Sequence, residues 1–254
     1  MNLDGNHVLI TGGTSGIGLA LAEAFLAAGS SVAICGRSAA RLEEVRRRHP
    51  RLLTLVCDVS RDDDRRQLSA WAQAILPDLN VLINNAGVQR DIDFTLGLGD
   101  FEHGDNEIRV NLEATIALTG LFAPLLAKNP SPVLVNVSSG LGFIPKACMP
   151  VYCASKAGVH AFTVAVRVQL AVRGIRTVEV IPPAVDTALN PAGRAARGDY
   201  HAGLDAKTFV AAVMLGLAAD ATEIGYGMTA TLAEATPGEL RQRFAQMNAD
   251  FRPV

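Results

Sequence analysis

The chain has 254 residues, of which 49% are hydrophobic and 19% charged, an ordinary balance for a globular protein. Its net charge of -2 gives no electrostatic reason to expect nucleic acid or an anionic membrane as a partner. The length suits a single domain over residues 1–254.

Apolar, β-branched runs alternate with helical patterns along the chain. The predicted strands are His7–Thr11, Ser31–Cys35, Leu52–Cys57, Val81–Asn84, Val133–Val137 and Thr177–Ile181. The predicted helices are Gly16–Ala28, about Ala39–His49, one that begins at Ser60, about Asn106–Ala127 and about Tyr152–Val172. Strands that are apolar throughout and separated by helices indicate a parallel sheet covered on both faces. The sequence therefore predicts an α/β fold, a doubly wound parallel sheet of Rossmann type.

Two segments interrupt this alternation, Gln89–Asp105 and Ala188–Gly203, and both are rich in glycine and polar residues. Each follows a predicted strand, where the ligand-binding loops of such sheets belong, although a surface insertion is the alternative. Gly193 and Gly198 favour a substrate loop near residues 188–203, a lid that is weakly ordered until substrate binds.

A glycine-rich turn, TGGTSGIG at residues 11–18, joins the first predicted strand to the first helix. Glycines permit a tight turn and let the backbone approach a pyrophosphate, which the N–H groups at the helix start attract. The spacing G-x-x-x-G-x-G in this context predicts a dinucleotide site. The candidate cofactor-binding residues of the turn are Gly12, Thr14, Ser15, Gly16, Ile17 and Gly18.

Two further strand ends agree with such a site. Asp58 and Val59 follow the third strand, where a carboxylate could accept a hydrogen bond from the adenine amino group, or could simply start the next helix. Asn85, Ala86 and Gly87 follow the fourth strand, where small residues let a cofactor lie against the strand end. The asparagine amide could also bridge backbone groups across the sheet.

The end of the second strand predicts which dinucleotide is preferred. A carboxylate that would accept from the 2′-hydroxyl of NAD(H) is expected here, but the position falls on Gly36. Arg37 offers a planar cation that can pair with the 2′-phosphate of NADP(H), with Ser15 and Ser38 as further donors. We therefore expect NADP(H) to be preferred and NAD(H) to be the second choice, unless Arg37 is only a solvated residue before the next helix.

Tyr152 and Lys156 lie four residues apart at the start of a predicted helix, which places both side chains on one face. A tyrosine has a pKa of about 10, and a nearby ammonium favours its phenolate, so the pair suits proton transfer. Ser138 and Ser139 end the fifth strand at the same edge, where a hydroxyl could hold a carbonyl oxygen while Tyr152 protonates it. Asn111 lies inside a helix, where a buried asparagine is often only a satisfied polar group.

Other kinds of site find no support. The four cysteines and five histidines show no metal-ligand or disulfide spacing, so we expect reduced thiols and no metal. No apolar run reaches the length of a membrane span; the best candidate, Phe209–Ala219, is about half as long as needed. The N-terminus lacks the pattern of a signal peptide, so we expect a cytoplasmic protein.

The motifs TGGTSGIG, NNAG, NVSSG and YCASK, in this order, resemble those of the short-chain dehydrogenases/reductases, over nearly the whole chain. The resemblance implies a seven-stranded parallel sheet and a homo-oligomer, a tetramer or a dimer, built partly on the helix that carries Tyr152. It selects Ser139 as the catalytic serine, 13 residues before the tyrosine. At Pro183 the chain has proline where the family commonly has glycine, so we expect the backbone there to differ.

The resemblance also assigns roles around the nicotinamide. It implies that Asn111 joins a water relay to Lys156, and that Lys156 binds the nicotinamide ribose. Asn85 and Tyr152 would line the cofactor, and Val185 would contact its carboxamide end.

In activity, the resemblance implies an oxidoreductase that interconverts a ketone and a secondary alcohol by hydride transfer, with Tyr152 as the acid/base. Two alternatives stay open: a dinucleotide-binding regulator without turnover, and an epimerase or dehydratase on the same fold. We expect a small carbonyl or alcohol substrate of apolar character. The residues that suggest it flank the catalytic positions and could equally be core: Leu141, Phe143, Met149 and Val151.

Overall fold

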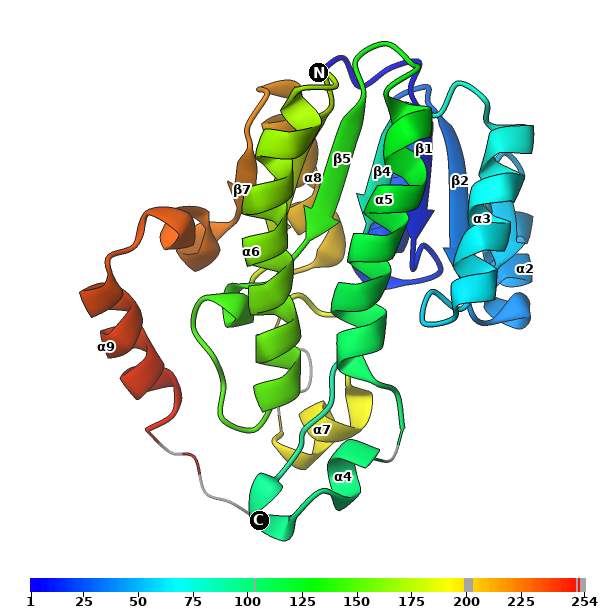
Figure 1. Cartoon of the computed structure of the whole chain (residues 1–254). Helices are drawn as coiled ribbons and strands as arrows, with labels where there is room; N and C mark the ends of the chain where they lie inside the picture. Colours follow the sequence, from blue (N-terminus) through cyan, green and yellow to red (C-terminus); the bar gives the residue numbers. More distant parts are fainter. Residues whose placement is uncertain (103, 199–202, 250, 252–254) are drawn as a thin grey trace.

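Seven parallel strands form a sheet in the order β3-β2-β1-β4-β5-β6-β7 (Figure 1). The computed structural model describes residues 1–102, 104–198, 203–249 and 251. Its strands are β1 (His7–Thr11), β2 (Ser31–Gly36), β3 (Leu53–Val56), β4 (Val81–Asn84), β5 (Val133–Val137), β6 (Arg176–Ile181) and β7 (Glu223–Gly225). The predicted doubly wound parallel sheet of Rossmann type is confirmed. Its strand order reverses at β1 and β4, and ligands bind such sheets at this point, outside the carboxyl ends of the strands.

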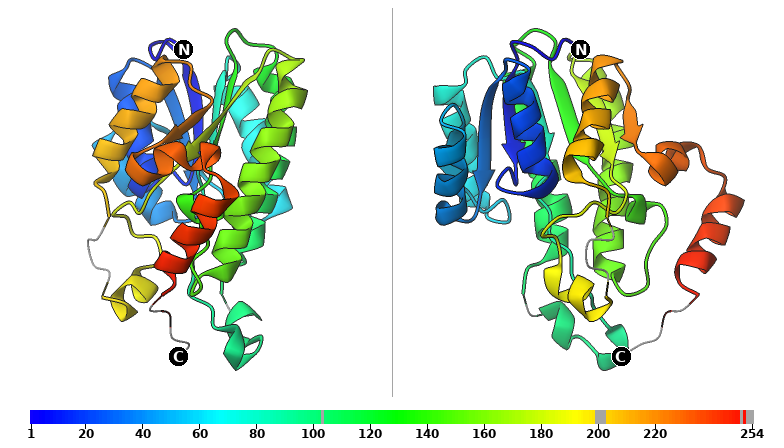
Figure 2. Two further views of the ribbon diagram at one scale, coloured as in Figure 1. Left: turned by 90° about the vertical axis from the view of Figure 1, so that its left-hand side faces the viewer. Right: turned by 180° about the vertical axis from the view of Figure 1, so that it is seen from behind.

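The strands are apolar throughout because each is covered on both faces. In β1, Val8 and Ile10 pack into one core and Leu9 packs into the other. Fully burying one such side chain contributes about 1.5–3 kcal/mol. The first core is covered by α1 (Gly16–Ala27), α2 (Ala39–Arg48) and α8 (Ala206–Ala218), and the second by α3 (Asp62–Ile75), α5 (Ala114–Leu126) and α6 (Pro150–Ala171). Figures 1 and 2 show the two helical layers from opposite sides.

The helix predicted over Asn106–Ala127 is divided in the structure. Ile108–Glu113 form a π-helical turn, η2, and α5 follows it directly. Together, Ile108–Leu126 are long and apolar enough to pass for a membrane span, so the expectation that no run reaches that length was wrong. The segment covers the sheet, with Leu118 and Phe122 buried in the second core, and its apolar character is that of a packed helix.

The segments that follow the strands gather at the carboxyl edge of the sheet, where α4 and α7 lie in Figure 1. They are η1 (Phe94–Leu96) and α4 (Gly99–Glu102) after β4, η3 (Gly140–Gly142) after β5, α7 (Pro191–Ala196) after β6, and η4 (Gly227–Glu234) and α9 (Pro237–Met247) after β7. Both segments that interrupt the strand–helix alternation therefore lie at this edge. Of the predicted substrate loop, residues 199–202 fall outside the described part of the chain.

Candidate active site

A cavity of about 1050 Å³ lies at the carboxyl edge of the sheet. With the exception of Asn111, every predicted catalytic or cofactor-binding residue contributes to its lining. The lining passes from Arg37 at one end, past the glycine-rich turn, to Tyr152 and Lys156 at the other. The β1–α1 turn, both interrupting loops and the start of α6 thus share one cavity.

The turn between β1 and α1 can be formed only with glycine at its close contacts. Gly12 has a φ of 66°, in the left-handed region that favours glycine. A Cβ on Gly12 would lie 2.9 Å from Ala86 Cα, and one on Gly18 would collide with the carbonyl oxygen of Gly12. The N-cap residue of α1, Ser15, makes no side-chain capping bond. The N–H groups of the first helical turn therefore face the cavity with capacity for an anion.

At the Arg37 end of the cavity, three of the predicted cofactor ligands already have hydrogen-bond partners within the protein. Arg37 pairs with both carboxylate oxygens of Asp105, at 2.6 Å from Nη1 and 2.9 Å from Nη2. The Ser38 hydroxyl caps α2 by accepting from a backbone N–H of its first turn (3.3 Å). Asp58 accepts from the backbone N–H and the hydroxyl of Ser60 (3.0 and 2.7 Å). Asp105 is a residue that the sequence analysis did not identify.

Asn85 and Thr11 join the ends of β4 and β1. The Asn85 amide donates to the Thr11 carbonyl (2.9 Å), and the Thr11 hydroxyl accepts from the backbone N–H groups of Asn85 and Ala86 (both 3.0 Å). The bridging role that the sequence left open for Asn85 is therefore present. Just beyond, a Cβ on Gly87 would lie 3.6 Å from Lys156 Nζ. A Cβ at this position would be in ordinary van der Waals contact with the lysine, so the end of β4 lies beside α6.

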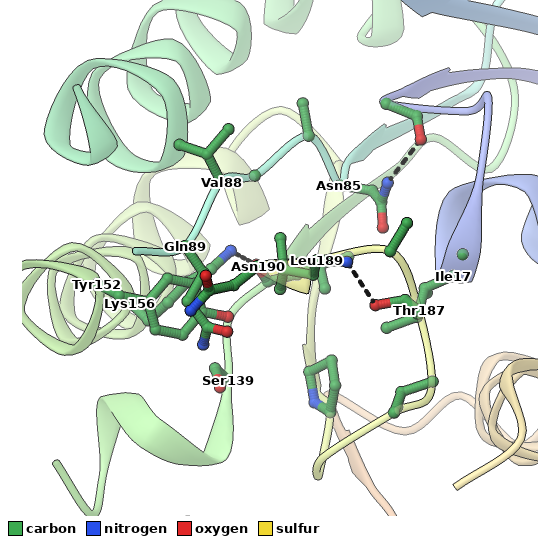
Figure 3. Close-up of a pocket in the computed structure, with 18 of the residues that line it drawn as sticks. Ile17, Asn85, Val88, Gln89, Ser139, Tyr152, Lys156, Thr187, Leu189 and Asn190 are labelled. Carbon is green, nitrogen blue, oxygen red and sulfur yellow. Dashed lines mark hydrogen bonds between the residues drawn. The ribbon is translucent and has the colours of Figure 1, made fainter. Parts of the chain in front are cut away.

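Tyr152 and Lys156 occupy neighbouring positions on α6, both buried. Lys156 Nζ lies 5.9 Å from the centre of the Tyr152 ring. The same ammonium donates to the carbonyl oxygen of Val137, the last residue of β5 (2.8 Å). This bond fixes the lysine at the end of the sheet, beside Tyr152 (Figure 3).

The two serines after β5 point in different directions. Ser138 donates to the Val180 carbonyl on the neighbouring strand (3.4 Å). Ser139 accepts from the N–H of Leu141 (3.1 Å) and is hydrogen-bonded to Tyr152. Ser139, the serine that the resemblance selects, is therefore the one beside the tyrosine.

Burial dominates the protonation of this pair. It raises the pKa of Tyr152 to about 12, with the Ser139 hydrogen bond acting in the opposite direction. It also lowers the pKa of Lys156 to about 8. The sequence suggested that the ammonium would favour the phenolate; in the protein alone, loss of solvent has the largest influence on the phenol and acts against its ionisation. At neutral pH Tyr152 is therefore a phenol, able to donate a proton.

Glu107 is a buried carboxyl group that the sequence analysis missed. It precedes η2, is fully buried, and accepts from the backbone N–H of Arg90 (3.0 Å). Burial raises its pKa to about 7, and its negative charge in turn raises the pKa of Tyr152. The surrounding sequence, HGDNEIR, is polar and carries no sign of this burial.

Asn111 lies in the π-helical turn and holds the loop after β4. Its Oδ1 accepts from the N–H of Val88 (2.8 Å), and its Nδ2 donates to the Val88 carbonyl and the Ser155 hydroxyl (both 2.9 Å). The side chain therefore ties this loop to η2 and α6. Since π-helical turns often occur at functional sites, the local geometry is consistent with a supporting role behind Lys156.

Beyond the catalytic end, the cavity wall is largely apolar. It contains Leu141, Met149, Leu189, Met228, Leu232 and Met247. Of the four residues expected to form this wall, Phe143 and Val151 are not in the lining. Phe143 instead packs on the His160 ring, with ring centres 4.4 Å apart. Two amides, those of Gln89 and Asn190, also belong to the lining (Figure 3).

One carboxylate holds both ends of α7. Asn190, the N-cap residue, donates to Asp91 Oδ1 (2.8 Å), and Arg197, the C-cap residue, pairs with Asp91 Oδ2. The described part of the expected lid is therefore a short helix fastened to the loop after β4. Asp91 and Asn190 were not singled out from the sequence.

Known proteins resemble the chain over most of its length. The family model described as short chain dehydrogenase matches residues 6–198. An uncharacterized oxidoreductase of Bacillus subtilis, DltE, is 42% identical over 248 residues, 98% of either chain. The human 15-hydroxyprostaglandin dehydrogenase (NAD(+)) is 31% identical over 204 residues, which cover 74% of this chain and 71% of that protein.

Solved structures agree with the fold. A short chain dehydrogenase from Burkholderia cenocepacia in complex with NADP superposes with a TM-score of 0.81 at 28% identity, over 96% of this chain and 99% of that one. A short-chain dehydrogenase from Sphingobium yanoikuyae in complex with NADPH gives 0.79 at 25% identity, over 97% and 96%.

Proposed function

The chain belongs to the short-chain dehydrogenase/reductase family, and on this premise we propose an NADP(H)-dependent enzyme that interconverts a ketone and a secondary alcohol. The observation that carries the proposal is the meeting of Ser139, Tyr152 and Lys156 at one end of a cavity whose other end holds the glycine-rich turn and Arg37. The phosphates of a dinucleotide fit the end with the glycine-rich turn and Arg37, and proton transfer fits the end with Tyr152.

The dinucleotide, when bound, supplies or accepts the hydride at the carbonyl carbon. The glycine-rich turn would hold its pyrophosphate, because the contacts of Gly12 and Gly18 leave space that a Cβ would fill. Lys156 would bind the nicotinamide ribose, and Val185 the carboxamide end. Asn111, which positions the neighbouring loop, would join Lys156 through water.

Tyr152 and Ser139 would act on the substrate oxygen. In reduction, the Tyr152 phenol gives its proton to the carbonyl oxygen while the Ser139 hydroxyl donates a hydrogen bond to the same atom. In oxidation, the proton returns to Tyr152. Burial of the phenol favours the neutral, proton-carrying form, which is the form that reduction needs.

The preference for NADP(H) rests on Arg37 and on the absence of a carboxylate at Gly36. Ser15 and Ser38 line the cavity beside Arg37 and would add hydrogen bonds to a 2′-phosphate. The Burkholderia cenocepacia and Sphingobium relatives bind NADP and NADPH. The human relative is named for NAD(+), so NAD(H) is retained as the second cofactor.

The substrate is a small carbonyl or alcohol compound with apolar character, since methionines and leucines form the wall beyond Tyr152. Residues 188–203 would act as the loop that closes over it. The Gln89 amide also lines the cavity and would offer a hydrogen bond to a substrate with a second polar group.

We also propose a cytoplasmic homo-oligomer, a dimer or tetramer. Val164 and Val168 on α6 and Val172 at its C-cap recur every four residues and are 42%, 74% and 84% exposed, and Ile116 on α5 is exposed as well. An apolar stripe of this kind marks a contact surface. Light scattering of the parent and of Val168→Glu measures the oligomeric state, and the variant should shift to a smaller species.

A panel of ketones and secondary alcohols tests the activity, read as NADPH consumption or formation. Turnover of any member, with stoichiometric change of the nicotinamide, supports the proposal. A regulator would bind NADPH without turnover. An epimerase or dehydratase would convert its substrate without net consumption of the cofactor.

A further inference from the structure

The guanidinium of Arg37 is already occupied by a carboxylate of the same chain. Both Nη atoms bind Asp105, at 2.6 and 2.9 Å, so the two planar groups face each other as a fork. The two residues lie 68 positions apart, one after β2 and the other on the loop after β4. Their side chains are 50% and 39% exposed, so solvent and ligands can reach the pair.

The pair lies at the end of the cavity where the adenosine half of the cofactor belongs. Arg37, Ser38, Asp58 and Asp105 all line it there. A phosphate on the adenosine ribose would use the same two Nη donors that Asp105 now takes. Because a guanidinium offers this face to one bidentate anion at a time, carboxylate and phosphate are alternatives.

The loop presents Asp105 in a defined way. Gly104, directly before it, has a φ of 88°, a left-handed conformation that glycine adopts without strain. Asn106, directly after it, accepts from the N–H of Arg109 and starts the following helical segment (3.1 Å). Asp105 therefore lies between a glycine turn and a helix start, and its carboxylate faces Arg37.

We infer that Asp105 sets the cofactor selectivity by competing with the 2′-phosphate for Arg37. The inference rests on the proposed function, in which Arg37 is the phosphate ligand. NADPH must displace Asp105 before it gains the guanidinium, and it then meets a nearby carboxylate of like charge. NADH, which lacks the phosphate, leaves the pair intact. Arg37 raises the affinity for NADPH above that for NADH, and Asp105 makes this difference in affinity smaller.

The test is fluorescence titration of NADPH and NADH with the full chain and four variants: Asp105→Asn, Arg37→Ala, the double variant and Glu102→Gln. Asn keeps the size of Asp105 and removes its charge. Glu102 is an exposed carboxylate of the same loop that does not line the cavity. Its variant therefore controls for a general change in the charge of the loop.

We expect Asp105→Asn to lower the Kd for NADPH about three- to tenfold, the scale of an exposed ion pair plus the loss of a nearby like charge. NADH affinity should change less than about twofold, and Glu102→Gln should change neither. In the Arg37→Ala background the same substitution should have a clearly smaller effect, because the competition is gone.

Three outcomes distinguish a failure of this inference from a failure of the proposed function. An equal effect of Asp105→Asn with and without Arg37 would overturn the competition and leave only charge repulsion. No effect of Asp105→Asn, while Arg37→Ala abolishes the NADPH preference, would overturn the role of Asp105 and keep the proposed cofactor site. No effect of Arg37→Ala on the ratio of the two affinities would overturn both.

Discussion

Glu179 Oε2 lies 2.8 Å from Nδ1 of His160, and His160 follows Lys156 by one helical turn on α6. The carboxyl is fully buried in β6, and the imidazole is half-buried. The hydrogen bond with Glu179 raises the pKa of His160, with smaller contributions from the charges of Glu179 and Glu223, while burial and Arg167 act in the opposite direction. The pair joins α6 to the sheet by a contact that depends on pH.

Stability should therefore fall as the pH rises past neutrality. A histidine whose pKa is raised by folding stabilises the protein fully below its ordinary value of about 6.5, and this contribution is lost as pH rises through the folded value. Urea unfolding of the parent and of His160→Gln at pH 6 to 9 measures it. The variant should show the shallower decline, while His7→Gln, on β1, should follow the parent. Parallel curves for all three would contradict the assignment.

A second pH dependence should come from Glu107. Its pKa of about 7 lies above that of an ordinary glutamate, so the folded protein holds the proton that the unfolded chain releases. The free energy of unfolding should fall between about pH 4.5 and 7, by about 1–3 kcal/mol. Glu107→Gln should remove that loss and be more stable than the parent at pH 8. Gln can still accept from Arg90, so equal stability at pH 8 would show that burial of the charge costs little.

Replacement of Tyr152 by Phe should lower turnover by about 10²–10⁴-fold, the usual contribution of a general acid. NADPH affinity should stay nearly unchanged, because the ring remains and only the hydroxyl is lost. Single-turnover rates with any ketone from the panel measure the effect. Tyr226→Phe removes a hydroxyl that does not line the cavity and serves as the control. Turnover within a few fold of the parent would refute the proton-donor role.

Asp91→Ala should loosen α7 by releasing Asn190 and Arg197 together. We expect KM for the substrate to rise about tenfold with a smaller change in kcat, since the loop positions the substrate and takes no part in proton transfer. Hydrogen exchange of residues 190–198 should accelerate in parallel. Asp93→Asn, on the same loop but with its side chain on Thr95, is the matched control. An unchanged KM together with faster hydrogen exchange would show that α7 has no part in substrate binding.

The sequence predicted the parts of the molecule that depend on local pattern. The spacing of Tyr152 and Lys156 and the glycine turn at residues 11–18 follow from the short-range geometry of a helix and a turn, and the structure places both at the cavity. The partner of Arg37 could not be predicted, because Asp105 approaches only after the sheet has brought two distant loops together. The burial of Glu107 and the π-helical turn around Asn111 likewise depend on packing that no local periodicity records.

The segment after β7 lines part of the cavity and is fastened beside the start of α6. Met228, Leu232 and Met247 form part of the apolar cavity wall. Asn248 fastens the end of this segment by hydrogen bonds to Pro145 and Ala147, just before α6. None of the residues proposed for hydride or proton transfer comes from this segment. Part of the apolar wall therefore comes from a stretch of the chain separate from Ser139, Tyr152 and Lys156. Exchange of the segment after β7 would alter that part of the wall and leave these three residues in place.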